Sequence, residues 1–218
     1  ELLKFLAGED IASELKPGQI RCERFEDGAK LLCARSPHIT MGNLYCAENV
    51  LGGGIWDYFD LGENIVCVNA IGENIQQRLN GCDYDSDTML LTDDALLVNA
   101  AERYNGFFNV PVCNIKAAGK TEQTLSALDH DTSVNKIGEI VNLSQKLNSI
   151  LWNELYNGAD KREIFSVYED ICKLAVLSGL EIDKAKRSFE DISVGKELSA
   201  LRRKYKRPAP QFFAEIDE

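Results

Sequence analysis

Three aspartates at alternate positions, Asp83, Asp85 and Asp87, are the residues of this sequence best suited to chemistry. On an extended strand their side chains would share one face but lie about 6.5–7 Å apart, too far for one small ion. If the chain curls into a loop there, the carboxylate oxygens can reach the roughly 2.0–2.1 Å distances of bound Mg²⁺. Gly81 and Ser86 favour such a curl, because glycine and serine are common in turns. The three aspartates are therefore candidate metal ligands.

Bringing three carboxylates together is electrostatically unfavourable. Two unit charges about 4 Å apart repel by about 1 kcal/mol in water and by about 4 kcal/mol at an effective dielectric constant of 20. Three such pairs therefore cost roughly 3–12 kcal/mol. The cluster must hold either a proton, with at least one raised pKa, or a divalent cation. A set of hard oxygen ligands favours the cation, with Mg²⁺ expected and Mn²⁺ able to replace it.

Other interpretations of these aspartates stay open. The loop can be a solvated acidic turn, because the chain carries 35 Asp and Glu residues in all. Nearby acidic residues can also simply cap a helix, as Asp93 and Asp94 are expected to do. A calcium loop of the EF-hand kind is disfavoured, because Thr88 stands where that loop needs glycine and the residues that follow favour a strand.

The elements that must position this loop change character near residue 130. Before that point, glycines separate short apolar segments of strand length, with two short helices between them. This pattern predicts a compact β-rich barrel or sandwich rather than alternating βαβ units. The strands are expected at residues 19–25, 30–34, 65–69 and 89–91, and the helices at residues 73–79 and 93–104.

After residue 130, apolar residues recur at steps of three and four, which is typical of amphipathic helices. Thr132 or Ser133 can cap the first helix, and Asn157-Gly158 can end it. We expect an α+β fold with a leading segment over residues 1–17, a β-rich domain over 18–130 and a helical region over 131–218. About three helices are expected, at residues 137–155, 164–175 and 194–206.

Charge is distributed unevenly along the chain. The 24 basic and 35 acidic residues give a net charge of −11, which argues against a basic surface over the whole protein. Residues 184–207, by contrast, carry nine basic and three acidic residues, a balance of +6. Such a segment can follow a phosphate backbone or can be a solvated helix face. The candidate nucleic-acid contacts in it are Lys184, Lys186, Arg202, Arg203 and Lys204.

The cysteines and the apolar runs indicate where the protein works. The seven cysteines are an odd number without the close spacing of zinc or redox motifs. We therefore expect reduced thiols in a reducing, cytoplasmic compartment. No apolar run approaches the roughly 18 residues of a membrane span. The chain begins at Glu1 without a methionine, so we expect it to be part of a longer polypeptide.

A second motif precedes the acidic loop, with Arg35-Ser36-Pro37-His38 followed by Gly42. Together with the Asp83–Asp87 loop, it resembles the second double-psi β-barrel of the two-barrel RNA polymerases. That superfamily includes the large subunit of cellular RNA polymerase, the RNA-dependent enzymes of gene silencing and single-chain phage enzymes. Residues 131–142 are similar to the helix that follows the barrel in the silencing and phage enzymes, and residues 174–186 are similar to a later segment of the same enzymes. The resemblance extends over roughly residues 18–187.

This resemblance implies a double-psi β-barrel followed by helices, and an RNA polymerase activity dependent on Mg²⁺. The three aspartates would hold the ion that activates an RNA 3′-hydroxyl for attack on a nucleoside triphosphate. Arg35, His38 and Asn80 would contact the substrate, although Arg35 can equally form a surface ion pair and His38 can be structural. The implied partners are a nucleic-acid template, the RNA product and the rest of the parent polypeptide, whose first barrel supplies lysines. The chain alone is then expected to be inactive.

The sequence also departs from the pattern of these polymerases. Ser86 stands where they have glycine, and a serine costs about 1–2 kcal/mol if that position needs a positive φ. Asn80 lies one residue too far from Asp83 to match their asparagine. The alternative hypothesis is therefore a non-catalytic double-psi barrel that binds a metal, a nucleotide or nucleic acid as a scaffold or regulator.

Overall fold

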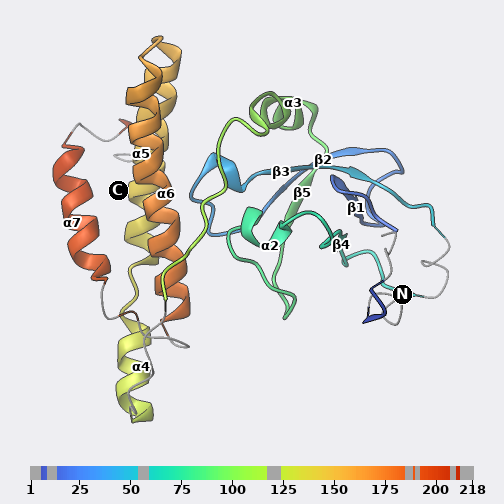
Figure 1. Cartoon of the computed structure of the whole chain (residues 1–218), viewed down its shortest axis with the longest axis horizontal. Helices are drawn as coiled ribbons and strands as arrows, with labels where there is room; N and C mark the ends of the chain where they lie inside the picture. Colours follow the sequence, from blue (N-terminus) through green and yellow to red (C-terminus); the bar gives the residue numbers. More distant parts are fainter. Residues whose placement is uncertain are drawn as a thin grey trace. The chain divides into compact units, whose positions relative to one another are not determined.

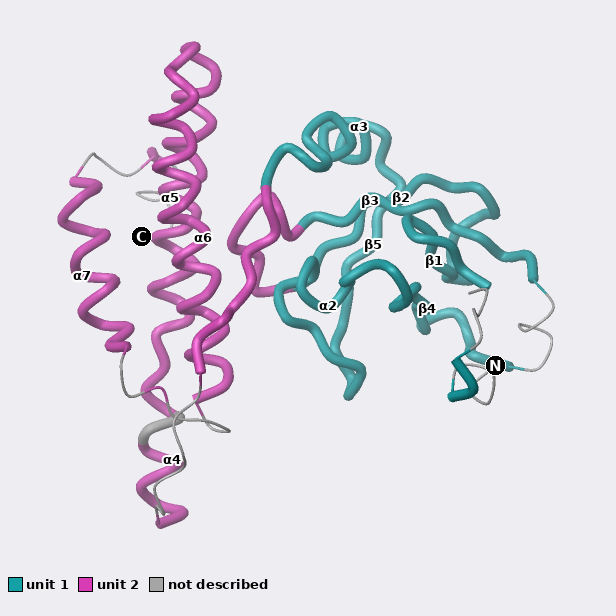
Figure 2. The backbone as a smooth tube through the Cα atoms, viewed as in Figure 1, with its two compact units in different colours: residues 1–35, 44–108 teal, residues 36–43, 109–218 magenta. Residues whose placement is uncertain are grey.

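The computed structural model describes residues 6–8, 14–53, 59–116, 124–184, 189, 192–206 and 210–211. It confirms a mixed α+β protein, and its elements are labelled in Figure 1. The chain forms two compact units, which Figure 2 shows in different colours. The first, here called the sheet unit, comprises residues 1–35 and 44–108. The second, the helical unit, comprises residues 36–43 and 109–218.

Within the described residues, the sheet unit contains one curled five-stranded sheet with the order β4-β1-β3-β2-β5. Strand β1 pairs with β3 in parallel, and the other three pairings are antiparallel. The two edge strands, β4 and β5, are therefore at opposite ends of the order, and the sheet is a half-barrel. The strands are β1 (Gln19–Arg21), β2 (Lys30–Ala34), β3 (Tyr45–Asn49), β4 (Cys67–Val68) and β5 (Leu90–Thr92).

The core of the sheet unit lies on the inner face of this curl. Ile20, Leu31 and Cys33 are completely buried there, because alternate residues of a strand point to the same face. Ile75 and Leu79, in and just after the short helix α2 (Ile75–Arg78), pack into the same cluster. The helix thus places the start of the acidic loop against the core.

One buried side chain, Asn49, shapes the turn between β1 and β2. Its Nδ2 donates to the carbonyl oxygens of Cys22 at 3.1 Å, Phe25 at 2.8 Å and Glu26 at 3.1 Å. Its Oδ1 accepts from the backbone N–H of Cys22 at 2.8 Å. The backbone after Arg21 therefore bonds to an amide side chain instead of a neighbouring strand. For this reason the strand expected over residues 19–25 ends at Arg21.

The two short helices expected in this half are confirmed. In α2 the side chain of Asn74 accepts a hydrogen bond from the backbone N–H of Gln77 at 3.0 Å. In α3 (Ala95–Tyr104), Asp94 caps the first turn by accepting from the N–H of Leu97 at 3.0 Å. The strand expected over residues 65–69 is shorter than predicted, since only Cys67–Val68 pairs with β1.

The helical unit contains the long helices α5 (Ile137–Tyr156) and α6 (Lys161–Asp183), which pack against each other. Their predicted apolar stripes are mostly buried, and Ile140, Leu147 and Leu174 are fully inaccessible. The predicted stop after α5 is also present, since Asn157 ends the helix and Gly158 has φ +73°. The third predicted helix is α7 (Val194–Lys204), and it contacts α6.

The predicted cap of α5 was wrong. Thr132 and Ser133 lie inside an additional helix, α4 (Leu125–Ser133), which the sequence patterns did not indicate. The residue that precedes α5 is Lys136, and its backbone N–H donates to Glu181 Oε2 at 3.0 Å. A carboxylate from α6 therefore satisfies a backbone group at the start of α5.

All seven cysteines are free thiols. Cys22, Cys33 and Cys82 are buried, and Cys113 is exposed. Burial raises the pKa of the Cys33 thiol to about 12, so this group stays protonated and packs as a small apolar side chain. Among the described helices, none combines the length and the apolar character needed to cross a membrane.

Candidate functional site

The acidic loop lies in the sheet unit between α2 and β5. Asp83, Asp85 and Asp87 are exposed, and one carboxylate oxygen of each lies within 4.8 Å of the others. The chain reverses just before them, where Asn80 has φ +58° and Gly81 has φ +70°. The side chains therefore converge as a curled loop requires, instead of following one face of a strand.

Arg35 joins the two ends of this loop. Its Nη1 donates to the carbonyl oxygen of Asn80 at 3.2 Å. Its Nη2 lies 2.9 Å from Oδ1 and 2.8 Å from Oδ2 of Asp87. The side chain of Arg35 is only 14% exposed, so this ion pair is well shielded from solvent. The structure shows the ion pair that the sequence allowed for Arg35, and substrate contact by this side chain stays a prediction.

A hydrogen bond inside the loop supports the same curl. The backbone N–H of Asp83 donates to Oδ2 of Asp87 at 2.9 Å. Cys82, next to Asp83, is buried under the loop. Burial is the largest cause that raises the pKa of the Cys82 thiol; Arg35 lowers it, and Asp87 and Asp83 raise it further. Cys82 therefore remains neutral beneath the acidic groups.

The three carboxylates fit the chemistry of a hard divalent cation. Neighbouring ligands of an octahedral Mg²⁺ are about 2.9 Å apart, given metal–oxygen distances of about 2.0–2.1 Å. The carboxylate oxygens lie within 4.8 Å of one another, so the loop must tighten for all three to share one ion. The exposure of all three leaves room for water ligands, which Mg²⁺ usually retains.

Ser86 has a positive φ, the conformation in which a serine is expected to be less stable than a glycine. Its φ is +149°, a region that glycine enters freely and other residues rarely adopt. Its hydroxyl donates to the carbonyl oxygen of Asp85. The position therefore needs a positive φ, and serine is strained there.

The remaining residues of the Arg35 motif belong to the helical unit. His38 is half-buried, and burial lowers its pKa. Its Nδ1 has no hydrogen-bond partner within the part of the chain that the structure describes. The structure therefore brings Arg35 and the Asn80 carbonyl to the acidic loop, and it assigns His38 to the other unit.

Gly42 has a packing role within the helical unit. A Cβ atom on it would lie 2.2 Å from the carbonyl oxygen of Asn109 and 2.7 Å from the hydroxyl of Tyr168. The Tyr168 hydroxyl itself donates to that carbonyl at 2.5 Å. The backbone N–H of Gly42 donates to Thr40 Oγ1 at 3.0 Å. Only glycine permits this close approach between residues 36–43 and α6.

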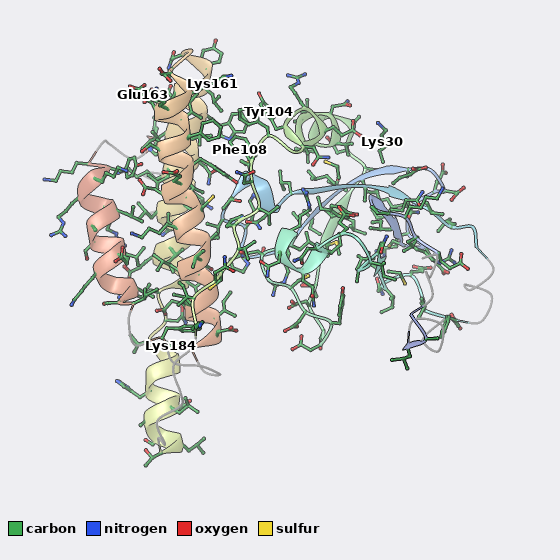
Figure 3. The ribbon with its side chains drawn as sticks, in the orientation of Figure 1. Lys30, Tyr104, Phe108, Lys161, Glu163 and Lys184 are labelled. Atoms are coloured by element: carbon green, nitrogen blue, oxygen red, sulfur yellow. The ribbon has the colours of Figure 1, made fainter. Side chains whose placement is uncertain are left out.

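Most of the predicted basic contacts take part in bonds within the helical unit. Arg202 pairs with Glu139 of α5 at 2.8 Å, and Lys204 pairs with Asp170 of α6 at 2.5 Å. Lys184, labelled in Figure 3, donates to the carbonyl oxygen of Val134 at 3.4 Å. Arg203 is exposed. Lys186 lies outside the described residues.

The sequence interpretation missed a pocket of about 490 Å³ beside the acidic loop. Arg35, Asp83 and Asp87 line it together with apolar side chains from β4 and the residues before it, from α2 and its C-terminal end, and from the residue before β5. The apolar run at residues 65–68 was the only signal in the sequence, and it predicted a strand without indicating a hollow beside it.

Comparison with models of protein families found no match to this chain, and comparison with curated proteins found no relative. The interpretation of the site therefore depends on its own geometry.

Proposed function

We propose that this chain carries the catalytic barrel of an RNA polymerase, which transfers nucleotides to an RNA 3′-hydroxyl with Mg²⁺ or Mn²⁺. The observation that carries the proposal is the convergence of Asp83, Asp85 and Asp87 on one loop. The curled sheet that bears this loop is compatible with a double-psi β-barrel, which we also propose. The sixth strand of such a barrel is not among the five strands of the described residues.

The aspartates would hold the ion through one oxygen each, and Arg35 would act as a positioning residue. A divalent cation bound there would lower the pKa of a hydroxyl and offset the charge on a phosphoryl group. Because Arg35 bonds both Asn80 and Asp87, it fixes the distance between the two ends of the loop. This contact reduces the entropy that the loop would lose when its carboxylates gather around a cation.

The proposal implies partners that the chain itself does not contain. These are a nucleic-acid template, the RNA product and nucleoside triphosphates. A further partner is the rest of the parent polypeptide, whose first barrel would supply lysines to the phosphates. For the helical unit we propose RNA contact through exposed Arg203, because Arg202 and Lys204 already pair with Glu139 and Asp170.

Metal binding provides the first test of this proposal. Replacing Asp85 with Asn removes one charged ligand without changing the size of the side chain. Asp85→Asn should weaken Mn²⁺ binding at least tenfold in calorimetry, which corresponds to about 1.4 kcal/mol. Asp93→Asn is the matched control, because Asp93 is an exposed aspartate near the loop and outside the cluster. Equal binding by wild type and Asp85→Asn would place the metal elsewhere.

Nucleotide incorporation provides the second test. In the parent polypeptide, Asp85→Asn should abolish extension of an RNA primer, and Asp93→Asn should leave it unchanged. RNA and DNA templates should be compared in the same assay. Extension that continues in Asp85→Asn would refute the catalytic role.

A second candidate function, a metal-binding module without catalysis, is supported by two observations. Ser86 is strained at φ +149°, and Asp87 is already paired with Arg35. Both features favour a rigid loop that holds a cation weakly. Mn²⁺ binding in the absence of any primer extension by the parent polypeptide would favour this function over polymerisation.

A further inference from the structure

The pocket beside the acidic loop has the size and lining of a small-molecule site. Its volume is about 490 Å³, within the roughly 300–1,000 Å³ typical of ligand pockets. It lies between the segment that leads into β4, the helix α2 and the residues before β5. The apolar side chains that line it are Ile65, Val66, Val68, Ile75, Leu79 and Met89.

Most of the apolar side chains that line this pocket belong to the core cluster of the sheet unit or pack against it. Ile75 and Leu79 are almost completely buried. Val66, Val68 and Met89 are half-buried and pack against the core cluster. An apolar body that enters the pocket would therefore cover partly exposed apolar surface on existing walls, at about 25 cal/mol for each Å² removed from water.

The pocket has an acidic mouth. Asp83 and Asp87 line it directly, and an oxygen of Asp85 lies within 4.8 Å of theirs. Among the described residues that line the pocket, the only basic side chain is Arg35, which is bonded to Asp87 and to the Asn80 carbonyl. One arginine against three aspartates gives a formal charge of 1 − 3 = −2 at the mouth. Apolar walls focus this field, so cations are attracted and anions repelled.

An aromatic ring adds to the same preference. Tyr84 lines the pocket between Asp83 and Asp85, and 65% of its surface is exposed. The face of a tyrosine ring attracts cations within about 6 Å by about 0.5–1 kcal/mol at an exposed site. The ring and the carboxylates therefore favour the same kind of ligand group.

We propose that this pocket binds a small organic amine, with its apolar or aromatic body between β4 and α2 and its protonated amine at the acidic mouth. This site goes beyond the proposed function and does not depend on it. Since the amine and a divalent cation use the same carboxylates, the two exclude each other. If the metal supports catalysis, the amine is an inhibitor.

Two matched probes test the charge preference. Tryptamine carries an ammonium group on an indole, and indole-3-propionate carries a carboxylate at the equivalent position. In methyl-detected NMR, tryptamine should shift the signals of Val66, Val68 and Met89. It should bind at least tenfold more tightly than indole-3-propionate, and Asp83→Asn should reduce this ratio. Equal affinity for the two probes would overturn the proposal.

Substitutions that fill the pocket test its location. Val68→Phe places a ring in the pocket, and Thr88→Trp does so from the exposed mouth. Both should weaken tryptamine binding at least tenfold. Val50→Phe is the matched control, because Val50 is half-buried in the same unit and outside the pocket. Unchanged binding in both filled variants would place the amine elsewhere and overturn the proposal.

Competition with Mn²⁺ separates this inference from the proposed function. Mn²⁺ should raise the apparent dissociation constant of tryptamine in proportion to its occupancy of the carboxylates. Mn²⁺ that binds without displacing tryptamine would overturn the amine site as placed here. If Mn²⁺ does not bind but tryptamine does, the proposed metal-dependent function fails and the amine site stands.

Discussion

The sheet unit and the helical unit are each stabilised internally by a different kind of interaction. The helical unit is built around helices of 20 and 23 residues, with apolar stripes that are mostly buried. The strands of the sheet unit are only two to five residues long. Its loops depend on single polar side chains, such as Asn49 at the turn after β1 and Arg35 at the acidic loop. The unit with the candidate chemistry is therefore the one with the weaker periodic pattern.

Glu73 is a third such polar side chain in the sheet unit. Its Oε2 accepts from the backbone N–H of Gly18 and from the hydroxyl of Tyr45, both at 2.9 Å. Burial is the main cause that raises the pKa of Tyr45, and the bond to Glu73 raises it further. Removing the Glu73 carboxylate would leave its hydrogen-bond donors without a partner. Removing one methyl group from the apolar face of α5 or α6 would only reduce the packing contacts there.

The largest change in stability that we predict comes from the buried apolar face of α6 in the helical unit. Leu174 is fully buried in α6, so Leu174→Ala should lower the free energy of unfolding by about 2–5 kcal/mol. Thermal or urea unfolding followed by circular dichroism measures this change. Leu125→Ala is the matched control, because Leu125 is 83% exposed and should change stability by less than about 0.5 kcal/mol. Similar losses in both variants would contradict the importance of the stripe.

Gly42→Ala should give the next largest effect, about 1–3 kcal/mol, because its Cβ would lie 2.2 Å from the Asn109 carbonyl oxygen. Urea unfolding measures the loss. Gly179→Ala is the control, since Gly179 lies in α6 with open space around its Cβ position. That variant should gain about 0.5–1 kcal/mol from helix propensity. A neutral Gly42→Ala would mean that residues 36–43 can move away from Tyr168.

In the sheet unit, Ser86→Gly should stabilise the protein by about 1–2 kcal/mol, because glycine adopts φ +149° without strain. Urea unfolding measures this gain, and Mn²⁺ titration shows whether the relaxed loop binds the cation differently. Ser199→Gly, on the exposed face of α7, should instead lose about 0.5 kcal/mol. A loss in Ser86→Gly would show that the hydrogen bond to Asp85 outweighs the strain.

The smallest predicted effect is a pH dependence from His38, whose pKa burial lowers. An unfolded histidine has a pKa of about 6.5, so below this value the unfolded chain binds the proton more readily. Stability is therefore complete above about pH 6.5 and falls as the pH drops toward the folded-state pKa, by at most about 1.4 kcal/mol for each pH unit. His38→Gln should flatten this slope, which urea unfolding at several pH values measures. A slope that survives His38→Gln belongs to another group.

The sequence predicted the elements of the helical unit better than those of the sheet unit. The stripes of α5 and α6 indicated both helices, since a period of 3.6 residues persists over many turns. Strand ends were predicted less well, because β1 stops where the backbone bonds to Asn49, 27 residues after Cys22 in the sequence. Such a long-range bond to a side chain leaves no periodic signal around residue 22.

The sequence predicted which residues form the candidate site, but it did not predict their contacts with residues far away in the chain. The spacing of the three aspartates indicated a shared site, and their oxygens do converge. The bond from Arg35 to Asp87 spans 52 residues, so the sequence could not show that Arg35 contacts the loop. The ion pairs of the basic segment were not predictable either, because its composition does not show that Glu139 and Asp170 pair with Arg202 and Lys204.

The interruption of the sheet unit by residues 36–43 has a consequence for any attempt to dissect the protein genetically. No single cut separates the units, because the helical unit takes an eight-residue excursion from between β2 and β3. A fragment that starts at residue 109 loses the Ile39 carbonyl that accepts from Asn148 at 2.9 Å. Exchange of either unit with another protein therefore requires two crossovers, and circular permutation requires a new end outside this excursion.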